Sequence, residues 1–214
     1  GEIAFPDLKT GIDFLKCQAD FLGMTNMNYA NELIERLRLD PRANLKRMSK
    51  GMKQKTALVA ALMNDAPIII LDEPTTGLDP QTRKNIWETI GKIQKETGMT
   101  VFLTTHYMEE AADADYVIVI DDGLIAAKGT PEQLKEEYSK DRLVLTAAET
   151  EALKKALAGR EYFVRADRIE VPLTRTLDAL PVLDACRGLI DGFEVLKGTM
   201  DDAFLAITGK EIRE

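Results

Sequence analysis

The first part of the chain shows the apolar spacing of α-helices. Between residues 8 and 39, apolar side chains recur three or four positions apart, and residues 23–28 interrupt the pattern. This spacing predicts two helices joined by a turn. Ser49 has the side chain of a helix N-cap and precedes a third pattern of the same kind, which continues to Met63. We therefore expect a helical segment over about residues 8–64.

The period changes after Pro67. Residues 68–71 form a continuous, mostly β-branched apolar run that ends in acidic residues, which is typical of a strand buried on both faces of a parallel sheet. Residues 80–95 return to helical spacing, and residues 100–104 form a second apolar run after Gly98. Strand, helix and strand in this order predict a βαβ crossover and the α/β fold class.

A hairpin and a well-marked helix start follow this crossover. We expect a short helix over residues 108–114, and then two strands at 116–120 and 124–127 around an Asp-Asp-Gly turn at 121–123. Residues 130–133, Thr-Pro-Glu-Gln, place a capping Thr before a Pro at the first helical position and a Gln at the third. These residues therefore predict another helix.

The pattern changes again from about residue 142. Short apolar runs predict strands, and segments that begin with capping side chains predict helices. The expected strands are 143–145, 162–164, 169–171 and 193–196, and the expected helices are 146–157, 177–186 and 199–207. This order predicts a small α+β ferredoxin-like domain over residues 142–214, after a first domain over residues 1–141.

Composition narrows the class of protein. Of 214 residues, 45% are hydrophobic and 30% are charged, and the longest unbroken apolar run, Ala57 to Met63, is far shorter than the roughly 20 residues that cross a bilayer. We therefore expect a soluble chain. A formal net charge of −8 argues against nucleic acid as a partner. Cys17 and Cys186 fit no metal or redox spacing, which favours a reducing, cytoplasmic setting.

Two adjacent carboxylates follow the first predicted strand. Asp72 and Glu73 lie at the carboxyl end of a parallel strand, where α/β folds bind ligands. Since successive side chains of an extended chain point apart, one can hold Mg²⁺ while the other orients or deprotonates an attacking water, as phosphoryl transfer requires. A strand that merely ends in solvated acids is the alternative. His106, the only histidine, follows the second strand and can hydrogen-bond a phosphate near Glu73.

Three segments together resemble the motifs of ATP-binding cassette (ABC) ATPases. Residues 72–80, Asp-Glu-Pro-Thr-Thr-Gly-Leu-Asp-Pro, resemble the Walker B and D-loop segment. Residues 48–55, Met-Ser-Lys-Gly-Met-Lys-Gln-Lys, resemble the signature motif at the family's spacing from Walker B. Residues 104–106, Thr-Thr-His, resemble the segment with the switch histidine. The resemblance covers about residues 5–135 and implies an ABC-type P-loop ATPase fold that binds ATP and Mg²⁺.

The resemblance implies a role for each motif residue. In the family, two ATPase domains face head to tail, and each ATP lies between the P-loop of one domain and the signature of the other. Asp72 then holds Mg²⁺ through water, and Glu73 and His106 act in catalysis. The residues implied to contact nucleotide are Ser49, Gly51, Met52, Gln54 and Asp79, of which Asp79 is also a candidate N-cap for the following helix. Lys50 replaces a family Gly, and it either adds a cation near phosphate or points to solvent.

The loop that cradles nucleotide phosphates in such ATPases does not occur in this sequence. Its pattern is Gly-x-x-x-x-Gly-Lys-Ser/Thr, and neither Gly91-Lys92 nor Gly209-Lys210 has the following hydroxyl residue or the preceding Gly. We therefore expect a truncated ATPase domain, with a helical subdomain at 8–64 and the C-terminal part of the parallel-sheet core at 65–141. This chain alone is expected to be inactive without a P-loop segment.

The end of the chain favours one branch of the family. Residues 198–209, Gly-Thr-Met-Asp-Asp-Ala-Phe-Leu-Ala-Ile-Thr-Gly, resemble the tail of ABC ATPases of the drug- and antibiotic-export type. The resemblance implies a dimeric ATPase subunit on the cytoplasmic face of the cell membrane, joined by its helical subdomain to a separate transmembrane permease. The domain at 142–214 is then regulatory, dimer-supporting or a passive packing domain. The alternatives are a soluble ABC ATPase acting on ribosomes or DNA, and a non-catalytic interaction module.

Overall fold

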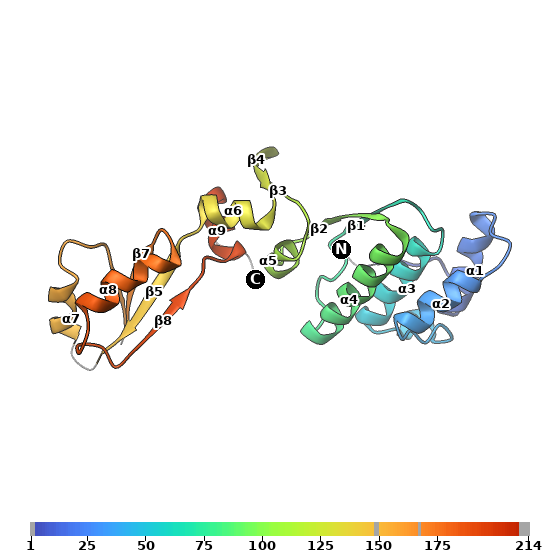
Figure 1. The fold of residues 1–214 in the computed structure, drawn as a ribbon. Helices are drawn as coiled ribbons and strands as arrows, with labels where there is room; N and C mark the ends of the chain where they lie inside the picture. Colours follow the sequence, from blue (N-terminus) through green and yellow to red (C-terminus); the bar gives the residue numbers. More distant parts are fainter. Residues whose placement is uncertain (1–2, 148–149, 167, 210–214) are drawn as a thin grey trace. The chain divides into compact units, whose positions relative to one another are not determined.

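The computed structural model describes residues 3–147, 150–166 and 168–209. The chain divides into two compact units, whose border in the sequence lies between Thr105 and His106 (Figure 1). The first unit holds helices and a parallel strand pair, and the second holds a hairpin and an antiparallel sheet. The fold is therefore of the mixed α/β kind that the sequence predicts.

Helices make up most of the first unit. They are α1 (Gly11–Phe21), α2 (Asn28–Arg36), the 3₁₀ turn η1 (Leu45–Arg47), α3 (Lys50–Leu62) and α4 (Pro80–Thr97). Thr10 and Asp13 form a capping box at the start of α1. At the start of α3, the Ser49 hydroxyl accepts a hydrogen bond from the Met52 amide at 3.3 Å. The two helices predicted within 8–39 and the third after Ser49 are confirmed.

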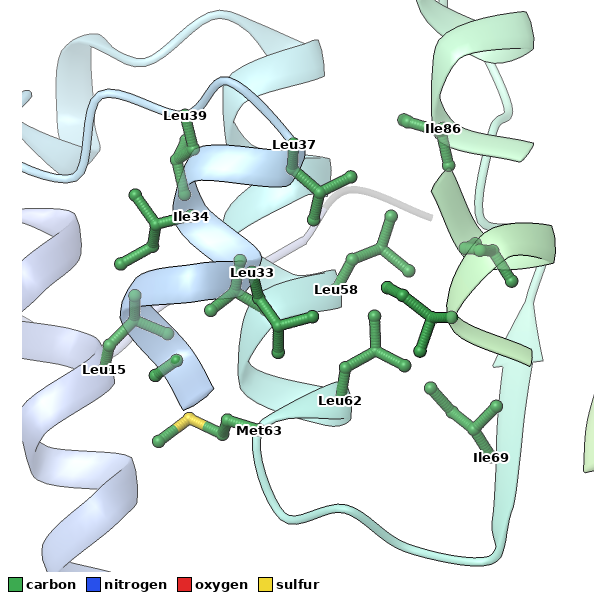
Figure 2. Close-up of a cluster of buried hydrophobic side chains, with 14 of the residues drawn as sticks. Leu15, Leu33, Ile34, Leu37, Leu39, Leu58, Leu62, Met63, Ile69 and Ile86 are labelled. Atoms are coloured by element: carbon green, nitrogen blue, oxygen red, sulfur yellow. The ribbon is translucent and has the colours of Figure 1, made fainter. Parts of the chain in front are cut away.

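One apolar core joins these helices. Leu15 of α1, Leu33 of α2, Leu58 of α3 and Ile86 of α4 belong to the same buried cluster. Figure 2 shows side chains from different helices pointing toward one another in this cluster. Ile86 is one of three buried isoleucines that recur at helical spacing along α4, so the amphipathic pattern predicted for this helix is confirmed.

The strands β1 (Ile68–Asp72) and β2 (Thr100–Thr104) run parallel on either side of α4 in the sequence, which confirms the βαβ crossover. The expectation that β1 is buried on both faces is wrong for the described chain. Ile69 packs into the core, whereas Ile70 is 73% exposed, and the neighbouring Phe102 of β2 is exposed as well. Side chains of a strand alternate between its two faces, and the helices of the first unit cover only one of them.

The second unit begins with a short helix and a hairpin. Its first elements are α5 (Met108–Ala112), β3 (Val117–Asp121), β4 (Leu124–Gly129) and α6 (Pro131–Tyr138). β3 and β4 pair antiparallel, as the turn at 121–123 predicts. The Thr130 side chain and Gln133 form the predicted capping box at the start of α6. This part of the sequence therefore contains enough local signals to specify its own elements.

Within the described ranges, the second unit also contains a four-stranded antiparallel sheet in the order β6-β7-β5-β8. Its elements are β5 (Asp141–Thr146), α7 (Thr150–Ala156), β6 (Phe163–Arg165), β7 (Arg168–Leu173), η2 (Thr176–Asp178), α8 (Ala179–Ala185) and β8 (Gly192–Leu196). Leu145 of β5, Leu153 of α7 and Val182 of α8 share one buried cluster, so both helices pack on the sheet. The helix predicted at 177–186 is split into η2 and α8. The predicted helix start includes residues 148–149, which lie outside the described ranges.

The last described helix, α9 (Met200–Thr208), is capped by Thr199 as predicted. It packs against α5, α6 and β4, and Met200 joins Leu134 of α6 in a third buried cluster. Thus α9, which belongs to the predicted 142–214 domain, packs on elements that precede residue 141. The division into domains at 141/142 stays a prediction. In the ranges that the structure describes, no helix combines the length and the apolar character of a membrane span.

Candidate functional site

The predicted pair of carboxylates lies at the carboxyl ends of two paired strands. Asp72 of β1 is in register with Thr104 of β2. The Thr104 hydroxyl donates a hydrogen bond to Asp72 Oδ1 at 2.5 Å. The backbone amide of Glu73 donates to Thr104 Oγ1 at 3.0 Å and to the Thr104 carbonyl oxygen at 3.2 Å. Thr104 therefore links the two acidic residues, a role that its place in the motif did not reveal.

Glu73 leaves the extended conformation of the strand. Its φ of +43° lies in the left-handed region, which non-glycine residues seldom adopt. Its carboxylate Oε2 accepts a hydrogen bond from Thr76 Oγ1 at 3.1 Å, and its carbonyl accepts one from the Thr76 amide at 3.3 Å. The alternation expected for an extended chain therefore does not apply here, but the carboxylates of Asp72 and Glu73 still have different partners.

Asp79 caps α4. Its Oδ1 accepts a hydrogen bond from the Thr82 amide at 2.9 Å, and Pro80 occupies the first turn of the helix. Hydrogen bonding to Thr82 lowers the pKa of the Asp79 carboxyl below its usual value, so the group is ionised at neutral pH. The interpretation of Asp79 as a helix cap is confirmed, and its contact with nucleotide stays a prediction.

The signature segment at the start of α3 packs against the start of α4 and the residue before its cap, Leu78. A Cβ atom at Gly51 would lie 3.5 Å from Thr82 Cγ2 and 3.8 Å from Leu78 Cδ2, so the start of α3 is in van der Waals contact with the start of α4. Ser49, Met52 and Gln54 belong to the same end of α3 or its cap. The first unit therefore brings the predicted signature and D-loop residues together. Nucleotide contacts for Ser49, Gly51, Met52 and Gln54 stay predictions.

The exposure of Lys50 agrees with the alternative that it points to solvent, and the structure adds a contact with a neighbouring loop. The residue is exposed, but its side chain lies along Gly77. A Cβ at Gly77 would overlap Lys50 Nζ and lie 3.1 Å from its Cε. Gly77 also has a φ of +72°, which favours glycine. Lys50 thus connects the signature segment with the loop after β1.

Substituting Gly77 with alanine is expected to destabilise the first unit by about 1–3 kcal/mol, because a Cβ both strains the backbone and displaces Lys50. Gly98→Ala is the matched control, since Gly98 has a φ of +71° but a Cβ there would meet nothing within 4 Å. Urea unfolding followed by the fluorescence of Trp87, the only tryptophan, measures both variants. Lys50→Ala should relieve part of the Gly77→Ala cost in a double-mutant cycle. Equal costs for the two glycine variants, without coupling to Lys50, would contradict the contact.

His106 is the first residue of the second unit and follows Thr105 directly in the sequence. Its ring stacks on that of Tyr107, with centroids 4.3 Å apart and planes tilted by 38°. Tyr107 in turn occupies the N-cap position of α5. The catalytic role of His106 with Glu73 stays a prediction.

The residues at the end of β1 suit a Mg²⁺ ion whose ligands are mostly water and phosphate oxygens rather than protein side chains. Among the described residues, no group of three or more His, Cys, Asp and Glu side chains could hold a metal ion by itself. Mg²⁺ is usually bound by one or two carboxylates together with water and substrate phosphates. The carboxylate of Asp72, oriented by Thr104, fits a site of that kind.

The chain is similar to known ATP-binding proteins. A family model described as "AAA domain, putative AbiEii toxin, Type IV TA system" matches residues 35–111. The chain is 34% identical over 218 residues to the Nod factor export ATP-binding protein I of Cupriavidus metallidurans, an alignment that covers 98% of this chain and 71% of that protein. It is 34% identical over 200 residues to the daunorubicin resistance ATP-binding protein DrrA3 of Streptomyces coeruleorubidus, covering 86% of this chain and 62% of that protein.

Solved structures show the same fold. An ATP-binding subunit of an ABC transporter is 29% identical with a TM-score of 0.55, and the match covers 64% of this chain and 59% of that one. A dimeric ATP-binding cassette bound to ADP and phosphate after hydrolysis is 24% identical with a TM-score of 0.55, and the match covers 60% of each chain.

Fold and motifs together define a cassette-type ATP-binding protein. The chain belongs to the ABC transporter ATP-binding proteins. It spans 62% of the length of the daunorubicin resistance relative and 71% of the Nod factor export relative.

Proposed function

We propose that the chain is part of an ATP-hydrolysing subunit that energises a membrane exporter. The observation that carries this proposal is the pair of carboxylates at the end of β1, which Thr104 links while each carboxylate keeps a separate partner. Two relatives are named for daunorubicin resistance and for Nod factor export. The exporter assignment follows from these names together with the tail at 198–209.

In this proposal the residues at the strand ends have different roles in ATP hydrolysis. Asp72, held by Thr104, binds Mg²⁺ through water, and the ion neutralises phosphate charge. Glu73 orients or deprotonates the water that attacks the γ-phosphate. Two hydrogen bonds from the Glu73 amide to Thr104 fix its backbone. The side chain that carries the carboxylate is therefore attached at a defined place. His106 hydrogen-bonds the same phosphate.

The proposal includes two protein partners. A second ATPase domain packs head to tail, so that Ser49, Gly51, Met52, Gln54 and Asp79 face the nucleotide held by its P-loop. The backbone amides and the positive dipole end at the N-terminus of α3 suit an anion. The helical subdomain contacts a transmembrane permease on the cytoplasmic face of the membrane. The strand order β6-β7-β5-β8, with α7 and α8 on the sheet, supports a ferredoxin-like accessory domain after the ATPase part.

We also propose that the P-loop of this subunit lies outside these 214 residues. Isothermal calorimetry of the 214-residue chain with Mg-ATP should then detect no binding tighter than about 1 mM. A form extended by its upstream coding sequence, here called the P-loop form, should bind and hydrolyse ATP. ATP binding by the 214-residue chain alone would contradict the proposal that the P-loop lies outside it. A P-loop form that neither binds nor hydrolyses ATP would refute the ATPase function itself.

A further inference from the structure

The last helix of the described chain packs on the segment that follows His106. Met200 of α9 is buried in one cluster with Met108 and Ala111 of α5 and with Leu134 of α6. Phe204, one turn further along α9, packs against the same cluster. The face of α9 that carries these side chains therefore covers α5 and α6, although about 90 residues separate it from α5 in the sequence.

Several polar contacts fix the beginning of α9. Asp141, at the start of β5, accepts hydrogen bonds from the Gly198 amide at 3.1 Å and from Thr176 Oγ1 at 2.7 Å. Arg142 Nη2 lies 3.3 Å from Asp202 Oδ2, within α9. Gly198 passes so close to Ser139 that a Cβ there would overlap the serine side chain. The segment that leaves the antiparallel sheet, 198–202, thus contacts the segment that enters it, 139–142.

By contrast, α5 has little stability of its own. It has five residues, and its N-cap residue, Tyr107, makes no capping hydrogen bond with its side chain. A helix this short is not stable in isolation, because nucleation costs more than a few hydrogen bonds return. Packing of Met108 and Ala111 in the buried cluster therefore contributes to its position. The ring of His106 stacks on Tyr107, immediately before this helix.

We propose that Met200 and Phe204 are positioning residues for His106. By holding α5 in place, α9 fixes the N-cap Tyr107 and the imidazole stacked on it. The C-terminal segment is thereby coupled to the switch histidine. The catalytic consequence rests on the proposed ATPase function, whereas the placement of the ring does not.

Nuclear magnetic resonance can test the placement in the 214-residue chain without nucleotide. His106 is the only histidine, so its imidazole gives a single, easily assigned signal. Phe204→Ala and Met200→Ala should shift this signal and raise amide hydrogen exchange in α5 by about tenfold or more. Leu205→Ala is the matched control, since Leu205 lies on α9 outside the cluster and is 38% exposed. It should leave both readings unchanged.

Two further measurements distinguish a local effect on α5 from general unfolding. Amides of β5 and β7 report whether the antiparallel sheet stays folded, and Phe204→Leu, which retains an apolar side chain, should restore most of the α5 protection. An unchanged His106 signal in Phe204→Ala, with exchange raised in α9, would overturn the proposal. In the P-loop form, Phe204→Ala should lower kcat with little change in the KM for ATP. If that form does not hydrolyse ATP, the proposed function fails while the spectroscopic result stands.

Discussion

Replacing Glu73 with glutamine is expected to lower ATP hydrolysis by about 10²–10⁴-fold in the P-loop form. The substitution removes the base but keeps the size and shape of the side chain. A glutamine carbonyl can still accept the Thr76 hydroxyl, and the backbone amide keeps its bonds to Thr104. ATP binding should therefore stay near the wild-type level, and the loss should appear in kcat.

Steady-state phosphate release and nucleotide binding separate these two quantities. Glu88→Gln, on the exposed surface of α4, is the matched control and should leave both unchanged. Thr104→Val should also reduce kcat, because it removes the hydroxyl shared by Asp72 and the Glu73 amide. A Glu73→Gln protein that hydrolyses ATP at the wild-type rate would show that Glu73 is not the base.

Ile86→Ala is expected to cost the first unit about 2–5 kcal/mol of unfolding free energy. Ile86 is 0% exposed in the core shared by the helices (Figure 2), so its removal leaves a cavity that α2 and α3 cannot readily fill. Such a loss is a large part of the roughly 5–15 kcal/mol typical of a domain. Urea unfolding followed by Trp87 fluorescence measures it.

Ile70→Ala is the matched control for this prediction. It deletes the same atoms from a side chain that is 73% exposed. Its cost should stay below about 1 kcal/mol, the range of strand propensity in a host protein. If both substitutions cost the same, the exposed face of β1 is covered in solution.

Local signals explain why the helices could be predicted. α4 begins at Pro80 after an Asp79 cap and ends at Gly98, which adopts the left-handed conformation, and each of these features is encoded within a few residues. The burial of β1 was predicted incorrectly because an apolar run does not specify what covers it. The run at 68–71 is the same whether one or both faces of the strand are packed, and only tertiary structure decides between them.

The same contrast holds at the site. Motif order placed Asp72, Glu73 and Asp79 correctly at the ends of β1 and the start of α4. The link through Thr104 depends on the register of two strands that are about 30 residues apart, and the contact of Lys50 with Gly77 depends on how α3 meets a loop. Neither can be derived from a short segment, although a hydroxyl residue opposite the first acid in a parallel pair is a signal worth seeking.

The return of α9 to α5 and α6 has a consequence for synthesis of the protein. Leu134 leaves the ribosome roughly 65 residues before Met200, which corresponds to about 3–13 s at ordinary rates of translation. During that interval, the apolar surface around α6 lacks the helix that completes its core. A chain that ends early would keep that surface open to chaperones and proteases.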